Sequence, residues 1–189
     1  MLRIVGGKHR GRAIATPEGL ATRPTSNRAR EALFNILAHA SWRPDDTSPL
    51  IEARVLDAFA GSGALGIEAL SRGAAHATFL DSDPTAIRLI GENLRKIGET
   101  AAAKVVRGDA IRPPPTREAC DLVFLDPPYR SNLAGPALTA LAAAGWLKPD
   151  AIATVELANT EDLLPPTGFE VLDERRYGAA KILILRHAS

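Results

Sequence analysis

The tetrapeptide Asp126-Pro127-Pro128-Tyr129 follows an apolar run at 122–125 and carries residue types that could hold a planar amine. Prolines fix φ and lack N–H groups, so the backbone is rigid and its carbonyls are presented as acceptors. Asp126 supplies another acceptor, and the Tyr129 ring offers a face on which a base could stack. An acceptor for each N–H of an exocyclic amine would free the nitrogen lone pair to attack an activated methyl group. The alternative interpretation is a simple turn.

A glycine-rich loop lies upstream, between an apolar strand predicted at 54–59 and a helix predicted at 64–72. Gly61, Gly63 and Gly66 form the pattern G-x-G-x-x-G in the strand-to-helix context that nucleotide-binding loops require. Glycines permit positive φ and close approach of a ligand, and the helix start offers free N–H groups. The spacing predicts a nucleotide-like cofactor here, and a dinucleotide would fit the pattern equally well.

Two acids follow the next two predicted strands. Asp81 lies about 20 residues beyond the loop, where a carboxylate commonly binds ribose hydroxyls. A helix cap is its alternative role, although Asp83 is the better cap because Pro84 then occupies the first helical turn. Asp109 follows the third strand and could accept a hydrogen bond from an adenine amine, or be an ordinary turn residue.

Short apolar runs alternate with helical segments, which predicts a parallel sheet covered by helices. A helix at 26–39, capped by Ser26 or Asn27, should precede the alternation and bury Ala29, Ala32, Leu33, Ile36 and Leu37. The other expected helices are 84–97 and 133–144; the other expected strands are 77–81, 103–107, 121–125 and 151–157. Two final strands, 169–175 and 180–186, should form an antiparallel hairpin, with loops at 112–118 and 160–168.

Composition limits the function classes. The 189 residues are 46% hydrophobic and 24% charged, with no apolar run of the roughly 18 residues that a membrane span needs. The start of the chain lacks the apolar stretch of a secretory signal, so we expect a cytoplasmic protein. A single cysteine and four scattered histidines predict neither a disulfide nor a metal site.

Positive charge is concentrated at the N-terminus. The first thirty residues hold seven cations against the single acid Glu18, a surplus of six charges in a chain whose net charge is +1. Basic segments of this kind often contact phosphates, although a solubilising tail is the alternative. The predicted RNA-binding residues are Arg3, Lys8, Arg10, Arg12, Arg23, Thr25, Arg28 and Arg30. We expect an RNA-contacting extension at 1–42, a connecting loop at 43–53 and a catalytic domain at 54–189.

The motifs together resemble the bacterial 16S ribosomal RNA guanine-N2 methyltransferases of the RsmD type. The likeness is carried by RIVGGKHRGR at 3–12, RPTSNRAREALFNIL at 23–37, LDAFAGSGALGIEALSRGA at 56–74, DPPY at 126–129 and YG at 177–178. The N-terminal blocks are its most specific part, because many amino-methyltransferases share the other motifs. Asp81 stands where glutamate is commoner, and Asn27 where aspartate is usual.

The resemblance implies a Rossmann-like class I methyltransferase fold, with a seven-stranded, mostly parallel sheet whose last strand is antiparallel. It implies transfer of a methyl group from S-adenosylmethionine to the N2 amine of one guanine of 16S RNA, guanine 966 in the family. The partner would be the small ribosomal subunit or an assembly intermediate, and the enzyme a monomer. Asp126, Pro127, Pro128 and Tyr129 would be catalytic. The implied cofactor-binding residues are Asp57, Ala58, Phe59, Gly61, Ser62, Gly63, Asp81, Ser82, Asp109, Ala110 and Asp126.

Two other functions use the same motifs. An adenine-N6 DNA methyltransferase would share the DPPY tetrapeptide and the glycine loop, but no DNA-reading segment is evident in 189 residues. A non-catalytic ribosome-assembly factor could retain the fold, but the intact Asp126 and glycine loop argue against it.

Overall fold

A seven-stranded sheet forms the centre of the computed structural model, which describes residues 2–17, 24–40 (for 24–27 the backbone alone), 42 and 47–188. The strand order is β5-β4-β3-β6-β7-β9-β8, and β9 is antiparallel to both of its neighbours while β3 to β7 are parallel. The Rossmann-like fold and the antiparallel last strand are thereby confirmed. The strands are β3 (Arg54–Ala58), β4 (His76–Asp81), β5 (Ala103–Arg107), β6 (Cys120–Leu125), β7 (Leu147–Ala158), β8 (Phe169–Tyr177) and β9 (Ala180–His187).

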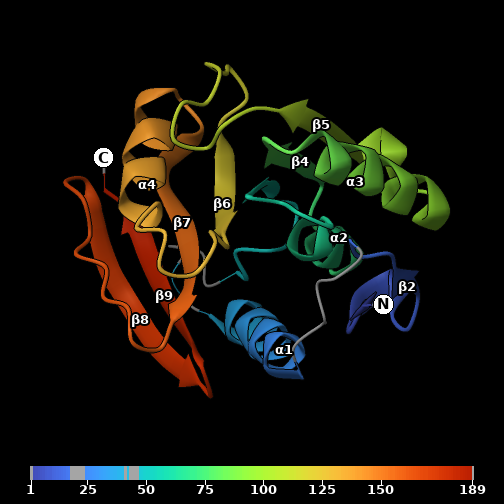
Figure 1. Cartoon of the computed structure of the whole chain (residues 1–189), viewed down its shortest axis with the longest axis horizontal. Coiled ribbons are helices and arrows are strands. Elements are labelled where there is room, and N and C mark those ends of the chain that lie inside the picture. Colours follow the sequence, from blue (N-terminus) through green and yellow to red (C-terminus); the bar gives the residue numbers. More distant parts are fainter. Residues whose placement is uncertain (1, 18–23, 41, 43–46, 189) are drawn as a thin grey trace.

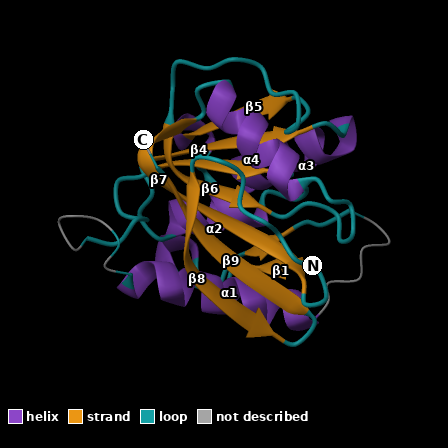
Figure 2. Cartoon of the chain, turned by 90° about the vertical axis from the view of Figure 1, so that its left-hand side faces the viewer, coloured by secondary structure: helices purple, strands orange, loops and turns teal. Residues whose placement is uncertain are grey.

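Helices cover both faces of the sheet (Figures 1 and 2). Buried residues of α1 (Pro24–His39), α2 (Ala64–Ser71) and α3 (Pro84–Ile97) share one hydrophobic cluster, whereas α4 (Ala134–Ala143) contributes to a second cluster on the other face. The loop at 108–119 adds Ala110 to the second cluster, and Trp146 packs there with its indole N–H donated to the Pro114 carbonyl at 2.8 Å. Every helix and strand predicted from residue 54 onward is present, with boundaries shifted by at most four residues.

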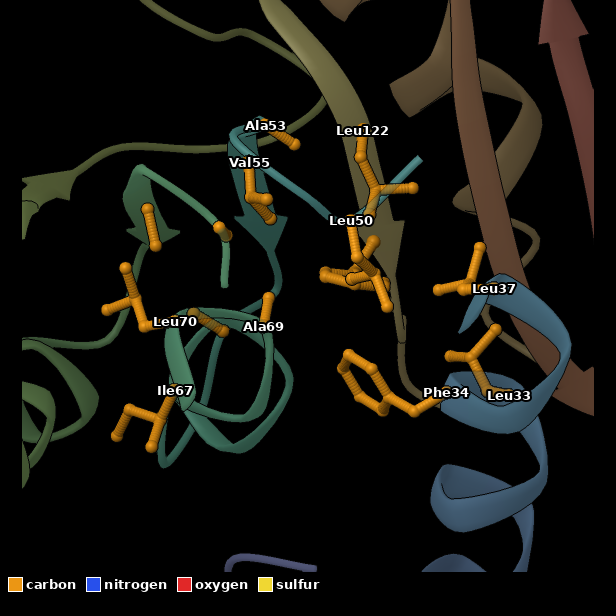
Figure 3. Packing of buried hydrophobic residues seen from close by; sticks show 14 of the residues in the cluster. Leu33, Phe34, Leu37, Leu50, Ala53, Val55, Ile67, Ala69, Leu70 and Leu122 are labelled. Atoms are coloured by element: carbon orange, nitrogen blue, oxygen red, sulfur yellow. The ribbon is translucent and has the colours of Figure 1, made fainter. Parts of the chain in front are cut away.

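Helix α1 begins at Pro24, two residues earlier than predicted, so Ser26 and Asn27 lie within the helix and the predicted cap is wrong. Ala29, Leu33 and Leu37 are buried as expected. Phe34, which the predicted face omitted, is also fully buried, and its ring lies 5.5 Å from that of Phe124 in β6. Figure 3 shows this side of α1 directed at Leu50 and Leu122, which places the helix against the middle of the sheet.

The N-terminus forms a small hairpin that the sequence did not predict. Strands β1 (Leu2–Arg3) and β2 (Ala13–Ile14) pair antiparallel around a 3-10 turn at Gly7–His9, and Ile4 and Ile14 enter the core. The hairpin lies beside α2 and α3 (Figure 1). A β-carbon on Gly7 would lie 1.8 Å from the Ser71 carbonyl oxygen at the end of α2. The glycine therefore permits close packing of the hairpin against the end of α2.

Candidate active site

The predicted site residues gather at the carboxyl ends of β3, β4 and β6. In a parallel sheet these ends lie along one edge, where ligands bind in open α/β folds. Asp57 pairs in register with Phe124, and Ala58 with both Leu80 and Leu125. The glycine loop, Asp81 and Asp126 therefore follow three neighbouring strands, and the structure brings the predicted cofactor and catalytic residues together.

The loop between β3 and α2 has the geometry of a ligand cradle. Gly61, Gly63 and the non-glycine Phe59 all have positive φ, at 55°, 78° and 63°. A β-carbon on Gly61 would meet nothing closer than a carbonyl oxygen 4.0 Å away, so the space above it is open. Gly63 precedes α2 as its N-cap residue and has no capping side chain, so of the first-turn N–H groups only that of Gly66 has a side-chain acceptor and the others are left for a ligand. The third glycine serves packing: a β-carbon on Gly66 would lie 2.4 Å from the Phe79 ring.

Asp57, in β3, is hydrogen-bonded to the glycine loop. Its carboxylate is buried at 1% exposure and accepts a hydrogen bond from the Gly66 N–H at 2.9 Å. Burial raises the pKa of Asp57 to about 8; the Gly66 hydrogen bond opposes the rise and the charge of Asp81 adds to it. The structure thus gives Asp57 a contact that positions the cofactor loop, in addition to the predicted place beside the cofactor.

Asp81 and Asp109 lie at the ends of β4 and β5. The Asp81 carboxylate accepts the Gly61 N–H at 2.8 Å and the Asp83 N–H at 2.9 Å, which joins the glycine loop to the next strand. Asp83 caps α3 through the Thr85 N–H, as preferred from the sequence. Asp109 accepts the Ile111 N–H at 3.0 Å in a turn. Of the other predicted cofactor residues, Ser82 is exposed beside Asp81, whereas Ala58 and Ala110 are buried and could offer only backbone atoms.

The DPPY tetrapeptide follows β6 directly. Asp126 is accessible to solvent and makes no hydrogen bond within the described part of the chain. Desolvation by the surrounding protein raises the pKa of Asp126 well above its usual value, and the negative charges of Glu156 and Asp57 raise it further. The Pro128 carbonyl accepts the Ser131 N–H at 3.2 Å, so it braces the loop that follows. Of the acceptors that the tetrapeptide was predicted to present, the Asp126 carboxylate and the Pro127 carbonyl accept no hydrogen bond from the described residues.

Glu156 is a site residue that the motif search missed. It lies near the end of β7, and its Oε1 accepts the Tyr129 hydroxyl at 2.7 Å. Burial raises the pKa of Glu156, against the Tyr129 hydrogen bond and the positive charge of Arg30. An acid near the carboxyl end of the strand predicted at 151–157 was the available sequence signal. Glu161 was missed as well: it accepts the Arg130 N–H at 2.7 Å and the Ala158 N–H at 2.8 Å, tying the loop after DPPY to the end of β7.

The predicted RNA-binding cations occupy different environments. Arg30 is 6% exposed, and its guanidinium donates to the Arg3 carbonyl at 2.8 Å in the vicinity of Glu68 and Glu156. Burial lowers the pKa of Arg30. A buried guanidinium with these partners is better placed to hold neighbouring segments together than to contact RNA phosphates. Arg3, Lys8, Arg10, Arg12 and Arg28 are exposed; Arg23 lies outside the described residues, as does the side chain of Thr25.

Some exposed cations also hold the hairpin in place. Arg12 donates to the Ile97 carbonyl at 3.0 Å and the Lys96 carbonyl at 2.9 Å, where it caps the end of α3. Lys8 and His9 both contact the Glu99 carboxylate. Burial would raise the pKa of Glu99, but the hydrogen bonds and charges of these two residues lower it.

Two polar side chains that the sequence analysis did not single out attach the hairpin to α2, to α3 and to the glycine loop. Glu68 of α2, 1% exposed, accepts the Val5 and Gly6 N–H groups at 2.8 Å each. Asn93 of α3 donates to the Ser62 carbonyl of the glycine loop at 2.9 Å and exchanges two hydrogen bonds with Ala15. The N-terminal hairpin therefore packs as part of the catalytic domain.

Comparison with known proteins identifies the family. The model of the family described as "Conserved hypothetical protein 95" matches residues 2–186. Ribosomal RNA small subunit methyltransferase D of Haemophilus influenzae is 37% identical over 182 residues, which cover 94% of this chain and 89% of that protein. The chain belongs to the RsmD family. The Escherichia coli protein of the same name is 38% identical over 165 residues, 87% of this chain and 78% of its own.

Solved structures agree with the family assignment. "Putative methyltransferase yhhF" from Escherichia coli superposes with a TM-score of 0.80 at 34% identity, covering 99% of this chain and 98% of its own. Like its relatives, this RsmD family member has the fold of a methyltransferase. Within the described residues, no helix is long and apolar enough to cross a membrane, and no group of three or more His, Cys, Asp or Glu side chains could hold a metal ion.

Proposed function

We propose that this RsmD family member transfers a methyl group from S-adenosylmethionine to the N2 amine of a guanine in the 16S RNA of the small ribosomal subunit. The observation that carries the proposal is the placement of DPPY: Asp126 is open to solvent at the end of β6, beside a glycine loop on the neighbouring strand. The relatives named ribosomal RNA small subunit methyltransferase D support the RNA as substrate. The guanine and its N2 amine rest on the family resemblance and on the chemistry of the site.

The residues at the sheet edge fit S-adenosylmethionine. The open space above Gly61 and the uncapped start of α2 at Gly63 suit its amino-acid end. Asp81 would accept hydrogen bonds from its ribose, and Asp109 from its adenine amine. When bound, the cofactor supplies a methyl group on a positively charged sulfur.

The protein's contribution to the reaction is to hold the amine. Asp126 and the Pro127 carbonyl would each accept one N–H, while Tyr129 offers its ring for stacking. Held in this way, the amine nitrogen would be aligned to attack the methyl group that the cofactor supplies when bound, and the electron pair of the broken methyl–sulfur bond would stay on sulfur. The extra proton on nitrogen then leaves to Asp126 or to water. No strong base is needed before attack, so proximity and alignment could supply several of the roughly 7–11 kcal/mol available to that effect.

The exposed cations of the N-terminal extension, residues 1–42, would contact RNA phosphates. Arg10 is exposed on the hairpin, and Arg28 on the first turns of α1. Neutralising phosphates releases counterions, so binding should weaken steeply with salt. Because the hairpin is packed against the ends of α2 and α3, we propose that its cations form a fixed surface.

The test is transfer of labelled methyl from S-adenosylmethionine to small ribosomal subunits that lack their own modification, followed by nucleoside analysis of the digested RNA. Label in N2-methylguanosine is the expected result. Label in N6-methyladenosine would replace the proposal with an adenine methyltransferase. Cofactor binding without any transfer would favour an assembly factor.

A further inference from the structure

The register of β6 and β7 places a second carboxylate beside Asp126. Leu125, the last residue of β6, pairs with Val155 of β7 in a parallel ladder; Glu156 is the next residue of β7, and Asp126 is the first residue after β6. Adjacent strands lie about 4.8 Å apart, and equivalent positions of parallel strands direct their side chains to the same face. Phe124 and Ile152 lie on the face covered by α1, so Glu156, four residues after Ile152 in β7, lies on that side; Asp126 follows Phe124 by two residues, just past the end of β6, and the charge of Glu156 acts on it. The two carboxylates therefore border one space at the end of the sheet.

Glu156 is held in a fixed orientation. Its Oε1 accepts the hydroxyl of Tyr129, the residue whose ring would stack on the base. Its Oε2 accepts no hydrogen bond from the described part of the chain. The hydrogen bond thus joins Tyr129 to the Glu156 carboxylate through Oε1 and leaves Oε2 as an acceptor. A carboxylate in this position is suited to a donor on the edge of the base that stacks on Tyr129.

In guanine, the ring nitrogen next to the exocyclic amine carries a hydrogen and is a hydrogen-bond donor. Its N1–H lies next to the N2 amine, whereas N1 of adenine, next to the N6 amine, is an acceptor. An ionised carboxylate accepts hydrogen bonds only, so it would bind the first pattern and repel the second. Burial raises the pKa of Glu156, and the Tyr129 hydrogen bond and the positive charge of the buried Arg30 act against that rise.

We propose that Glu156 is a specificity-determining residue that accepts the N1–H of the guanine whose N2 amine is held at Asp126. This inference rests on the proposed function, because it assumes that the amine is the N2 amine of guanine. It assigns the choice of base to a residue outside the DPPY motif. Tyr129 acts in it as a positioning residue for the carboxylate as well as a stacking surface.

The experiment uses small subunits assembled on 16S RNA with either guanine or 2-aminopurine at the methylated position. 2-Aminopurine keeps the 2-amine but has an acceptor at N1. Methyl transfer to both is measured for the wild-type protein and for Glu156→Gln, which retains an oxygen for Tyr129 and adds an N–H donor. Glu174→Gln, an exposed acid paired with Arg176 on β8, is the matched control. Cofactor affinity and thermal unfolding are measured for all three proteins.

We expect the wild type and the control to prefer guanine by about 100-fold or more in kcat/KM, the discrimination typical of sites built around a hydrogen bond. Glu156→Gln should reduce that preference by at least about 10-fold with unchanged cofactor affinity. Comparing two proteins on the same pair of bases cancels the difference in amine reactivity between the bases.

Two results would overturn the inference while leaving the proposed function intact. One is a wild type that methylates both bases within about 3-fold, a measurement that does not depend on how the variant folds. The other is a folded Glu156→Gln with the wild-type preference. Failure of the wild type to methylate guanine at all would instead overturn the proposed function, and this inference with it.

Discussion

Four acids at the carboxyl edge of the sheet form two pairs with opposite roles. Asp57 and Asp81 belong to the part that would bind the cofactor, called the cofactor half here, and Asp126 and Glu156 to the part that would hold the amine, called the amine half. Asp57 and Asp81 both accept backbone N–H groups of the glycine loop, at 2.9 and 2.8 Å. Asp126, which is exposed, and the Oε2 of Glu156, which is partly buried, accept no hydrogen bond from the described residues. Carboxylates at one sheet edge thus divide into a pair that shapes the cradle and a pair left available for a substrate. Substitutions in the first pair should affect folding and cofactor binding, and those in the second the reaction.

The largest expected effect is on turnover. Asp126→Ala removes an acceptor that holds the amine, and we expect kcat to fall by about 10³-fold or more, within the range of a positioned catalytic group. Label transfer to small subunits at saturating cofactor measures it. Asp121→Asn, on the same strand, where Asp121 pairs with Lys148 away from the site edge, is a suitable control. Methylation retained at more than a tenth of the wild-type rate would show that Asp126 does not hold the amine.

The next effect is on stability, in the cofactor half. At about pH 4, where burial keeps Asp57 uncharged, Asp57→Ala leaves the Gly66 N–H without its buried acceptor and should lower the free energy of unfolding by about 1–3 kcal/mol. Asp57→Asn keeps an acceptor and should cost less. Urea unfolding of both variants measures the difference. Equal stability of Asp57→Ala and the wild type would contradict the loop-shaping role.

Asp57 also predicts a pH dependence. Its pKa rises from 3.8 to about 8 on folding, so the folded state binds the proton more tightly. The stabilisation is complete below pH 3.8 and is lost as pH rises through about 8. The unfolding free energy of the wild type relative to Asp57→Asn should therefore decrease over this interval. A constant difference between pH 4 and 8 would exclude the raised pKa.

Gly66 and Gly61 separate packing from ligand access in the same loop. Gly66→Ala would place a methyl group 2.4 Å from the Phe79 ring and should destabilise the fold by about 1–3 kcal/mol. Gly61→Ala meets open space, so its effect should fall mainly on cofactor affinity, with about 1 kcal/mol of strain from its positive φ. Thermal unfolding and cofactor titration of both variants test the contrast, which the reverse pattern would refute.

The smallest effects concern the N-terminal hairpin. Arg12→Ala removes the two hydrogen bonds that cap α3 and should lower stability by about 1 kcal/mol.

Arg10 is exposed, so Arg10→Ala should leave stability unchanged and reduce the salt dependence of RNA binding by roughly one phosphate contact. Binding to small subunits over a salt series measures this slope. An unchanged slope in a variant that carries both Arg10→Ala and Arg12→Ala would remove the hairpin from the RNA interface.

Features dominated by local pattern were predictable from the sequence. The alternation from residue 54, the glycine loop and the hairpin with Gly178 in its turn depend on periodicity and on turn residues, and the structure has them in place. Asp83 as the cap of α3 follows from its position before Pro84. These signals involve residues that are neighbours in the chain.

Features that depend on distant contacts were not predictable. Gly7 is needed because it packs against Ser71, which is 64 residues away in the chain, and the sequence does not reveal this contact. Glu68 is buried because the hairpin covers it, which the sequence around Glu68 does not indicate either. Glu156 became a site residue only through strand register, which pairs Leu125 with Val155 across an intervening helix. Arg30 was predicted to face RNA because charge alone does not reveal burial.

The most direct test of the division between the two halves is a calorimetric titration of S-adenosylmethionine into Asp81→Ala and Asp126→Ala. The account predicts that Asp81→Ala binds at least about 10-fold more weakly, the loss of a charged hydrogen-bond partner, while Asp126→Ala binds within about 3-fold of the wild type. Cofactor affinity that survives in Asp81→Ala and is lost in Asp126→Ala would contradict it.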